Sequence, residues 1–370
     1  MRLAAFNVEN MFERAKAMNL DSWQEGREVL RDFAELTKLI QEDTYSAAIK
    51  AELLDILKRH RGLAANGDSA FIRLRDIRGR LLRRPRGAPV EVAAQGRSDW
   101  IGWFELKTES VKEVATLNTA RVIQLVGADV VCVVEADHRV NLNRFNRDVL
   151  PMVGATPYEQ VMLIDGNDDR GIDVGILVTN GHRLGLMQSH VDDLDTEGQI
   201  FSRDCPEFEI RTVKGNSLLV LINHFKSKGY GKPSESDAKR LRQAKRVREL
   251  VDERLGLFPY LAVVGDFNEI PTGKPLDPLL RNNSPLIDIF DHPTFHGDNR
   301  PGTYGNGTAS SKFDYILLSP ALAALVTAGG IERRGVWGGT KGTLFPHLDE
   351  MKSSKDAASD HAAVWAEFDL

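Results

Sequence analysis

Apolar and polar positions follow two patterns along the chain, one typical of buried strands and one typical of amphipathic helices. Short continuous apolar runs rich in Val, Ile and Leu predict strands that are buried on both faces. These runs cover residues 3–8, 128–135, 173–178, 218–223, 261–265, 313–318 and 362–368. Apolar residues at helical spacing predict helices over 27–41, 45–59, 110–126 and 237–255. The chain is therefore predicted to mix strands and helices, as α/β and α+β proteins do.

Polar side chains stand at or beside the ends of most of these predicted strands. They are Asn7 and Glu9, Glu135, Asp173, Asn223 and His224, Asp266 and Asn268, Asp314, and Asp360 and His361. The strand ends could converge on one side of a packed β-structure. A buried carboxylate is costly unless it holds a metal ion or pairs with a cation. A cluster of Asp, Glu, Asn and His without Cys favours a hard divalent ion such as Mg²⁺ or Mn²⁺.

Residues 13–108 differ in character from the rest of the chain. Their two predicted helices are followed by a stretch, residues 58–86, that holds ten Lys and Arg residues and only two acidic ones. Residues 72–83 and 100–106 alternate well enough to be strands of an exposed ribbon. We interpret residues 13–108 as an insertion or accessory subdomain within a single domain that spans residues 1–370.

Six short motifs occur in an order that resembles the endonuclease/exonuclease/phosphatase superfamily. They are Phe6–Asn10, Val134–Glu135, Ile222–Ser227, Val264–Asn268, Lys312–Ile316 and Ser359–His361. The superfamily includes pancreatic deoxyribonuclease, abasic-site endonucleases, sphingomyelinases and inositol polyphosphate phosphatases. The resemblance covers residues 1–12 and about 110–370. It implies an α/β fold of four layers, a two-sheet β-sandwich flanked by helices, with a helical and basic insertion after the first strand.

The resemblance also implies roles for individual residues. Asp266 orients or deprotonates the attacking water, and Asn268 hydrogen-bonds the scissile phosphate. Asp314 is the partner of His361, whose imidazole can then carry a positive charge toward the phosphate. Glu135 is the principal Mg²⁺ ligand. The other metal-site candidates are Asn7, Glu9 and Asp360.

Further candidates follow from the same resemblance. His224 resembles the second histidine of the deoxyribonuclease branch, and Asp173 is the carboxylate expected to orient it. Arg203 resembles an arginine whose guanidinium meets a phosphate. Asn223 and Lys226 complete the predicted phosphate- or substrate-binding residues. Each motif alone has an ordinary alternative: a β-turn at Gly265–Asn268, a solvent-facing strand end at Glu135, a strand-end histidine that caps a loop at His224, and surface positions for Arg203, Asp360 and His361.

The predicted reaction is Mg²⁺- or Mn²⁺-dependent hydrolysis of a phosphate ester by in-line attack of water. We predict a nuclease, an endonuclease or exonuclease acting on DNA or RNA, because the cations of residues 58–86 and 239–248 suit a polyanion. The alternative is a phosphatase or phosphodiesterase for a small phosphorylated metabolite or lipid head group. A binding protein without activity is disfavoured, because the matched catalytic positions carry competent residues.

Charge and aromatic content leave two points open. The formal net charge of the whole chain is −5, so no global basic field argues for a nucleic-acid partner. Both basic stretches could therefore be solvated surface. Four aromatic residues beside residues 58–86 could stack on bases, although we expect them to form the core of the insertion. They are Phe71, Trp100, Trp103 and Phe104.

Composition also bears on localisation. The two cysteines, Cys132 and Cys205, form neither a disulfide framework nor a metal-ligand cluster, which favours a reducing compartment. No run of 18 apolar residues predicts a membrane-spanning helix. The first residues contain no apolar segment typical of a secretory signal. We therefore expect a cytoplasmic protein with no membrane partner; the sequence does not indicate which protein partners it has.

Overall fold

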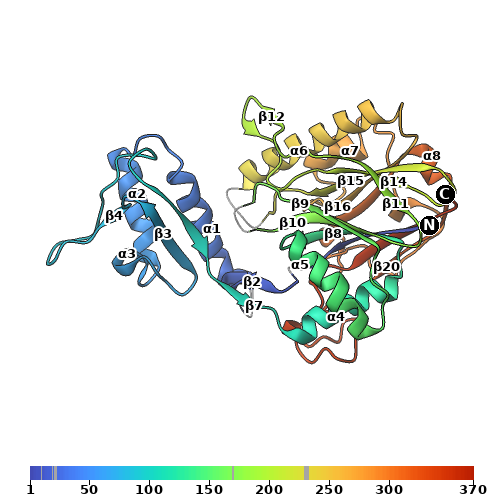
Figure 1. Ribbon diagram of the computed structural model, residues 1–370, viewed down its shortest axis with the longest axis horizontal. Coiled ribbons are helices and arrows are strands. Elements are labelled where there is room, and N and C mark those ends of the chain that lie inside the picture. The colour runs from blue at the N-terminus through green and yellow to red at the C-terminus, as the bar shows by residue number, and fades with distance from the viewer. Residues whose placement is uncertain (10, 19, 21–22, 169–170, 229–232) are drawn as a thin grey trace. The chain divides into compact units, whose positions relative to one another are not determined.

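The computed structural model describes residues 1–9, 11–18, 20, 23–168, 171–228 and 233–370 (Figure 1). The chain divides into two compact units. The larger unit comprises Met1–Phe12, Val111–Lys228 and Ser234–Leu370, and the smaller unit contains Glu13–Ser110. The predicted insertion, residues 13–108, lies within the smaller unit. That it is an accessory part of one catalytic domain remains a prediction.

Two mixed sheets form the centre of the larger unit. The seven-stranded sheet has the order β18 (Phe295–His296), β20 (Val326–Glu332), β21 (Ala363–Phe368), β1 (Arg2–Asn7), β8 (Val130–Ala136), β10 (Asp173–Val178) and β9 (Gln160–Ile164). The six-stranded sheet has the order β11 (Arg183–Gln188), β14 (Glu207–Arg211), β15 (Ser217–His224), β16 (Tyr260–Asp266), β19 (Asp314–Leu318) and β17 (Ile287–Asp288). In each sheet two central strands run parallel, β1 with β8 and β15 with β16. Their carboxyl ends therefore lie at the same edge of each sheet.

Helices cover the outer faces of both sheets (Figure 1). Residues from both sheets, such as Cys132 and Val220, form the core between them. On the other face of the first sheet, residues pack against α4 (Glu113–Val126). On the other face of the second sheet, residues pack against α6 (Pro233–Arg254). These strands are apolar at successive positions because both of their faces are buried. The structure confirms the predicted four-layer sandwich.

The remaining elements of the larger unit are short. They are α5 (Arg139–Arg144), α7 (Asp277–Leu280), α8 (Pro320–Ala323), and the hairpin of β12 (Leu194–Asp195) and β13 (Gly198–Gln199). The helix predicted over 110–126 begins only at Glu113, because residues 108–110 form a strand of the smaller unit. Among the described residues, no helix is long and apolar enough to cross a membrane.

The smaller unit has its own apolar core. Its helices are α1 (Trp23–Leu39), α2 (Ala47–Arg59) and α3 (Leu63–Asn66). Its strands pair as β2 (Glu13–Ala15) with β7 (Thr108–Ser110), β3 (Ile72–Arg78) with β6 (Ile101–Leu106), and β4 (Leu82–Arg83) with β5 (Glu91–Val92). Trp100 and Phe104 are buried in this core and Phe71 packs against it, as predicted. The prediction is wrong for Trp103, which is 44% exposed because the alternation of β6 turns it away from the core.

Candidate active site

Three strands of the sandwich end or begin with a polar side chain that faces the space between the sheets. In a strand, every second side chain points to the same face. Each of Asn7, Asp266 and Asp314 lies an even number of positions from residues of the intersheet core in its own strand, so its side chain points into the space between the sheets. Each of them is only 1% exposed. The strand pairing places His224 beside Asp266 and Asp266 beside Asp314. The predicted convergence of strand ends is therefore present in the structure.

One carboxylate oxygen, Oδ2 of Asp266, lies at the centre of this cluster. It accepts hydrogen bonds from Asn7 Nδ2 at 3.2 Å and from Asn268 Nδ2 at 3.1 Å. His224 Nε2 lies 3.7 Å from the same oxygen and His361 Nε2 lies 3.8 Å from it. Burial nevertheless raises the pKa of Asp266 from 3.8 to about 7, although the charge of His361 opposes this shift. A carboxylate with a pKa near neutral is well suited to act as a general base.

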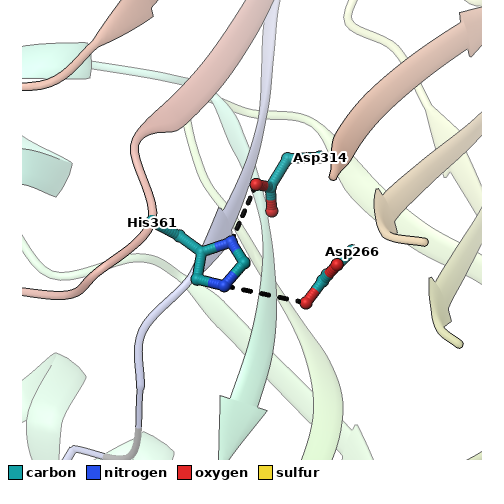
Figure 2. Close-up of side chains that lie close together, drawn as sticks. All are labelled: Asp266, Asp314 and His361. Carbon is teal, nitrogen blue, oxygen red and sulfur yellow. Dashed lines mark hydrogen bonds and ion pairs between the residues drawn. The ribbon is translucent and has the colours of Figure 1, made fainter. Parts of the chain in front are cut away.

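His361 lies between two carboxylates (Figure 2). Its Nδ1 is 2.8 Å from Asp314 Oδ2, and its Nε2 faces Asp266. Burial alone would lower the pKa of His361, but the charges of Asp314 and Asp266 raise this pKa well above its ordinary value. The imidazole is therefore expected to be protonated, with Asp314 fixing its orientation.

Replacing Asp314 with Asn should lower the pKa of His361, because it removes a negative charge 2.8 Å from the ring. An NMR titration of the imidazole in the metal-free full chain measures this shift. The matched control is Asp252→Asn on the exposed side of α6, which should leave His361 unchanged. A His361 titration that is the same in Asp314→Asn and in the native chain would contradict this account.

Two glutamates of the predicted site adopt left-handed backbone conformations that non-glycine residues rarely occupy. Glu9 has φ 48° and Glu135 has φ 63°. In the β8–β10 pairing, Val134 is opposite Val174 and Ala136 is opposite Asp173, so Glu135 is the extra residue of a β-bulge. Such conformations cost about 1–3 kcal/mol each and cluster at functional sites.

The bulge decides where the Glu135 side chain points. Without it, Glu135 would share the outer face of β8 with residues that pack against α4. Instead its Oε1 lies 3.5 Å from His224 Nε2 on the opposite sheet. Glu135 is half-buried and is therefore not the solvent-facing strand end that the sequence alone left open.

Glu9 joins the first strand to the segment that holds Asp360. Its backbone N–H donates to Asn7 Oδ1 at 3.0 Å, and its carboxylate Oε2 accepts from the Asp360 backbone N–H at 3.1 Å. Asp360 Oδ1 is in turn 3.7 Å from His361 Nε2. Glu9 and Asp360 therefore lie beside the central cluster.

The motif Gly265–Asn268 is the end of a strand rather than a simple turn. Gly265 has φ 124°, and a Cβ there would lie 2.0 Å from the Asn223 carbonyl oxygen, so only glycine fits. Phe267 stacks between Phe225 and Tyr315 in the core below α6. The chain then turns at Asn268, φ 50°, whose N–H donates to Asp266 Oδ1 at 2.8 Å. Each position of the motif thus helps to hold the Asp266 carboxylate.

Two predicted residues, Asn223 and Lys226, differ from this group in placement. Asn223 has the parity of Leu221, so it faces α6 rather than the intersheet space, and it is fully buried. Its Nδ2 is 3.4 Å from the Leu221 carbonyl oxygen. Lys226 is half-buried, and its backbone N–H donates to Gln243 Oε1. The structure does not bring Asn223 into the central cluster.

Arg203 and Asp173 are also buried. Arg203 is 2% exposed, so the alternative of an ordinary surface arginine is wrong. Its Nε lies 2.9 Å from Asp168 Oδ2. Asp173 accepts a hydrogen bond from the Gly166 N–H, and burial raises the pKa of Asp173 to about 7. The predicted contact of Arg203 with phosphate and the predicted orientation of His224 by Asp173 remain predictions.

Tyr304 belongs to the site although the sequence analysis did not identify it. Its ring centroid is 4.9 Å from that of His361 in an edge-on contact, and the two residues form an isolated β-bridge. The charge of Asp360, burial, and the charges of Glu9 and Asp266 raise the pKa of Tyr304. The sequence signal was weak, because Thr-Tyr-Gly-Asn-Gly is typical of an ordinary loop.

The ring of Tyr304, more than its hydroxyl, is expected to matter for activity. Tyr304→Phe keeps the edge contact with His361 and should change kcat less than threefold. Tyr304→Ala removes the ring contact that helps to hold the His361 imidazole in place. It should lower kcat by about tenfold or more, since misplacement of a reacting group by 1 Å can cost about 10²-fold. Steady-state kinetics on a small phosphodiester measures both variants. Equal kcat values for the Ala variant and the native chain would contradict this role.

The cluster fits a hard divalent ion. One ligand atom from each of Asp266, Asp314 and His361 lies within 4.8 Å of the others. Glu135 adds a further carboxylate near His224, and no thiolate is part of the cluster. Carboxylate oxygens are the donors that Mg²⁺ and Mn²⁺ prefer. Because Asp314 already holds Nδ1 of a protonated His361, the carboxylates are better ligands here than the imidazole.

The comparisons with known proteins identify the family of this chain. The model of the endonuclease/exonuclease/phosphatase family matches residues 113–361. A search of curated proteins gave no significant match.

Solved structures share the fold. An endonuclease/exonuclease/phosphatase family protein from Bacteroides thetaiotaomicron is 18% identical, with a TM-score of 0.50 over 70% of this chain and 90% of that one. A mannosyl-6-phosphatase of Bacteroides thetaiotaomicron VPI-5482 is 17% identical, with a TM-score of 0.50 over 70% of this chain and 92% of that one. At these identities the likeness shows the fold alone. Since the family model spans more than half of its residues, this chain belongs to the endonuclease/exonuclease/phosphatase family of metal-dependent phosphoester hydrolases.

Proposed function

We propose that this protein is a Mg²⁺- or Mn²⁺-dependent nuclease that hydrolyses phosphodiester bonds of DNA or RNA by in-line attack of water. The observation that carries the chemistry is the surroundings of Asp266 Oδ2, where four side-chain nitrogens approach one buried carboxylate oxygen. Hydrolysis of a phosphodiester requires a base for the water and positive or N–H groups for the developing charge. The cluster supplies both.

The roles of the residues follow from their contacts. Asp266 takes the proton of the attacking water, since burial keeps its pKa near neutral. Asn268 donates from Nδ2 to Asp266 Oδ2 and to the Phe225 carbonyl oxygen, so its proposed hydrogen bond to the phosphate replaces one of these two bonds. His361, oriented by Asp314, and His224 face the negative charge that develops on the phosphate oxygens.

The metal site is proposed at the carboxylates beside these residues. Glu135 is the principal ligand, and its bulge directs the carboxylate into the intersheet space. Asn7, Glu9 and Asp360 are the supporting candidates. The bound ion would supply Lewis-acid stabilisation of the phosphate and the leaving oxygen.

Exposed cations of the smaller unit support a nucleic-acid substrate. Several of them have no carboxylate of the described residues within ion-pair distance: Lys58, Arg61, Arg78, Arg80 and Arg86. Like charges left unpaired on one surface favour a polyanionic partner.

Four of the six cations in the second basic stretch, residues 239–248 of α6, give no such support. Arg240 is buried against Glu269, Arg242 pairs with Asp195, and Arg246 lies 2.7 Å from Asp193. Arg248 pairs with Asp252 one turn along the helix. These cations are already neutralised by the protein's own carboxylates.

The alternative is a phosphatase or phosphodiesterase for a small phosphorylated metabolite or lipid head group. Its support is electrostatic: residues 58–86 contribute a charge of +8 to a chain of −5, so the remainder carries about −13. Such a remainder repels a long polyanion. Cys132 and Cys205 are buried and unpaired, which supports action in a reducing compartment such as the cytoplasm.

A substrate panel tests the proposal. Plasmid, single-stranded DNA, abasic duplex, RNA, inositol phosphates and a generic diester are each incubated with the full chain and either Mg²⁺ or Mn²⁺. We expect kcat/KM to be highest for a nucleic acid. Hydrolysis of inositol phosphates or another small ester without cleavage of any nucleic acid would contradict the nuclease proposal and favour the alternative.

A further inference from the structure

The β3–β6 ribbon of the smaller unit has one covered face and one open face. Ile72, Leu74 and Phe104 point inward to the core of that unit. Residues directly opposite each other in an antiparallel pair project from the same face. The outward pairs are Arg73 with Glu105, Arg75 with Trp103 and Arg78 with Ile101.

A β-bulge adds to this open face. The pairing shifts between Asp76 and Arg78, so Ile77 is the extra residue, and it is 64% exposed. Trp103 is 44% exposed and Ile101 is 43% exposed. Apolar surface that is exposed as a group, rather than as scattered single residues, typically marks a binding surface.

The charge of the open face is positive. Arg73 and Arg75 share the carboxylate of Glu105, at 3.7 Å and 2.8 Å, and Arg73 also lies 3.4 Å from Asp68 Oδ1. Arg78 has no carboxylate of the described residues within ion-pair distance, and neither does Arg80 just beyond the strand. The exposed indole of Trp103 therefore lies directly opposite Arg75, and the unpaired Arg78 lies close by.

We propose that this open face binds a single strand of nucleic acid, with Trp103 stacking on a base and Arg75 and Arg78 contacting phosphates. The inference rests on the proposed nuclease function and specifies its substrate. Sequence-tolerant binding of single strands combines an aromatic platform with cations in this way. A duplex hides the faces of its bases within the stack, so it would use the arginines but not the indole.

The charge pattern favours a nucleic acid over a protein partner. Arg73, Arg75 and Arg78 face outward on one short ribbon, where Glu105 pairs with Arg73 and Arg75, Asp68 also pairs with Arg73, and Arg78 has no carboxylate of the described residues within ion-pair distance. Stacking on the indole and contacts of the arginines with phosphates use both the aromatic ring and the positive charge of the face, whereas an apolar partner would bury the unpaired charge of Arg78.

Fluorescence anisotropy tests this inference with the full chain in excess chelator, so that no substrate is cut. The probes are a labelled single-stranded oligonucleotide of mixed sequence and the duplex of the same sequence. Trp103→Ala should weaken single-strand binding by about 5- to 100-fold, the worth of one stacked base. Trp103→Phe should retain most of the affinity, and duplex binding should change less than twofold in both variants.

Matched controls separate stacking from charge. Leu257→Ala removes an apolar residue of the larger unit that is even more exposed than Trp103, at 74%, and should have no effect. Arg78→Gln should flatten the log–log salt dependence of single-strand binding by about 0.7. Lys245→Gln, an exposed lysine of α6, should leave that slope unchanged.

The outcomes distinguish this inference from the nuclease proposal. If the native chain cleaves oligonucleotides while Trp103→Ala binds the single strand as tightly as the native chain, the inference alone is overturned. Equal loss of single-strand and duplex binding in Trp103→Ala would overturn it as well. If the native chain hydrolyses a small ester but neither binds nor cleaves any oligonucleotide, both proposals fail, and the open face is then a surface for a protein partner.

Discussion

Replacing Asp266 with Asn is expected to lower kcat by about 10²- to 10⁴-fold, because the amide cannot accept the proton of the attacking water. The substitution keeps the size of the side chain and its place among Asn7, Asn268 and the two histidines. Steady-state hydrolysis of a small phosphodiester in saturating metal measures the loss. A circular dichroism melt checks that the fold is retained.

The account also predicts the direction in which activity changes with pH. Asp266 must be deprotonated to act as a base, and burial raises its pKa to about 7. The kcat/KM of the native chain should therefore rise as the pH increases through about 7, and Asp266→Asn should lack this limb. Asp252→Asn on α6 is the matched control and should behave like the native chain. An Asp266→Asn rate within threefold of the native rate would contradict the role of Asp266.

Removal of divalent ions is expected to abolish turnover, and Mg²⁺ or Mn²⁺ should restore it. The carboxylates that surround His224 and His361 repel one another and the phosphate unless a cation is bound. Glu135→Gln should raise the metal concentration needed for half-maximal activity by about 10- to 100-fold or more, the loss typical even of indirect metal contacts. A metal titration of the initial rate measures this shift.

The control for this experiment is Glu253→Gln, which removes a half-exposed carboxylate of α6 that pairs with Arg246 and with no site residue. Its metal requirement should equal that of the native chain. Full turnover of the native chain in excess chelator would contradict the assignment of a metal-dependent hydrolase.

Much of the site could be predicted because buried strands are visible in the sequence as apolar runs. The positions of Asn7, Asp266 and Asp314 at the ends of such runs follow from this pattern alone. Parallel pairing of β1 with β8 and of β15 with β16 then places strand ends together. The resemblance of six short motifs supplied the two-sheet fold and the roles of the residues.

Features that depend on a single local distortion could not be predicted. Strand alternation would place Glu135 toward α4, and only the bulge at that residue turns it toward His224. Asn223 has no such bulge, so its side chain faces α6 while the side chain of its neighbour His224 faces the site. A one-residue difference in register decides which side chain reaches the site.

Contacts and ion pairs between residues that are far apart in the sequence could not be predicted either. Counting the cations of residues 239–248 suggested a basic surface, but their partners Asp193 and Asp195 lie far away in the sequence. Tyr304 meets His361 across a separation that no local pattern reveals. In the smaller unit, the alternation of β6 predicts which face Trp103 occupies, yet only the structure shows that the described residues of that unit leave its side chain 44% exposed.

The most direct test of the central claim, attack of water on phosphorus at this site, is cleavage of a single-stranded oligonucleotide in ¹⁸O-labelled water with Mg²⁺ or Mn²⁺. Mass spectrometry of the products locates the label. The account predicts one solvent oxygen in the newly formed phosphate at each cleaved bond, and almost no labelled product from Asp266→Asn in the same time. Products whose new phosphate carries no solvent oxygen, or equal labelling by the Asp266→Asn variant, would contradict it.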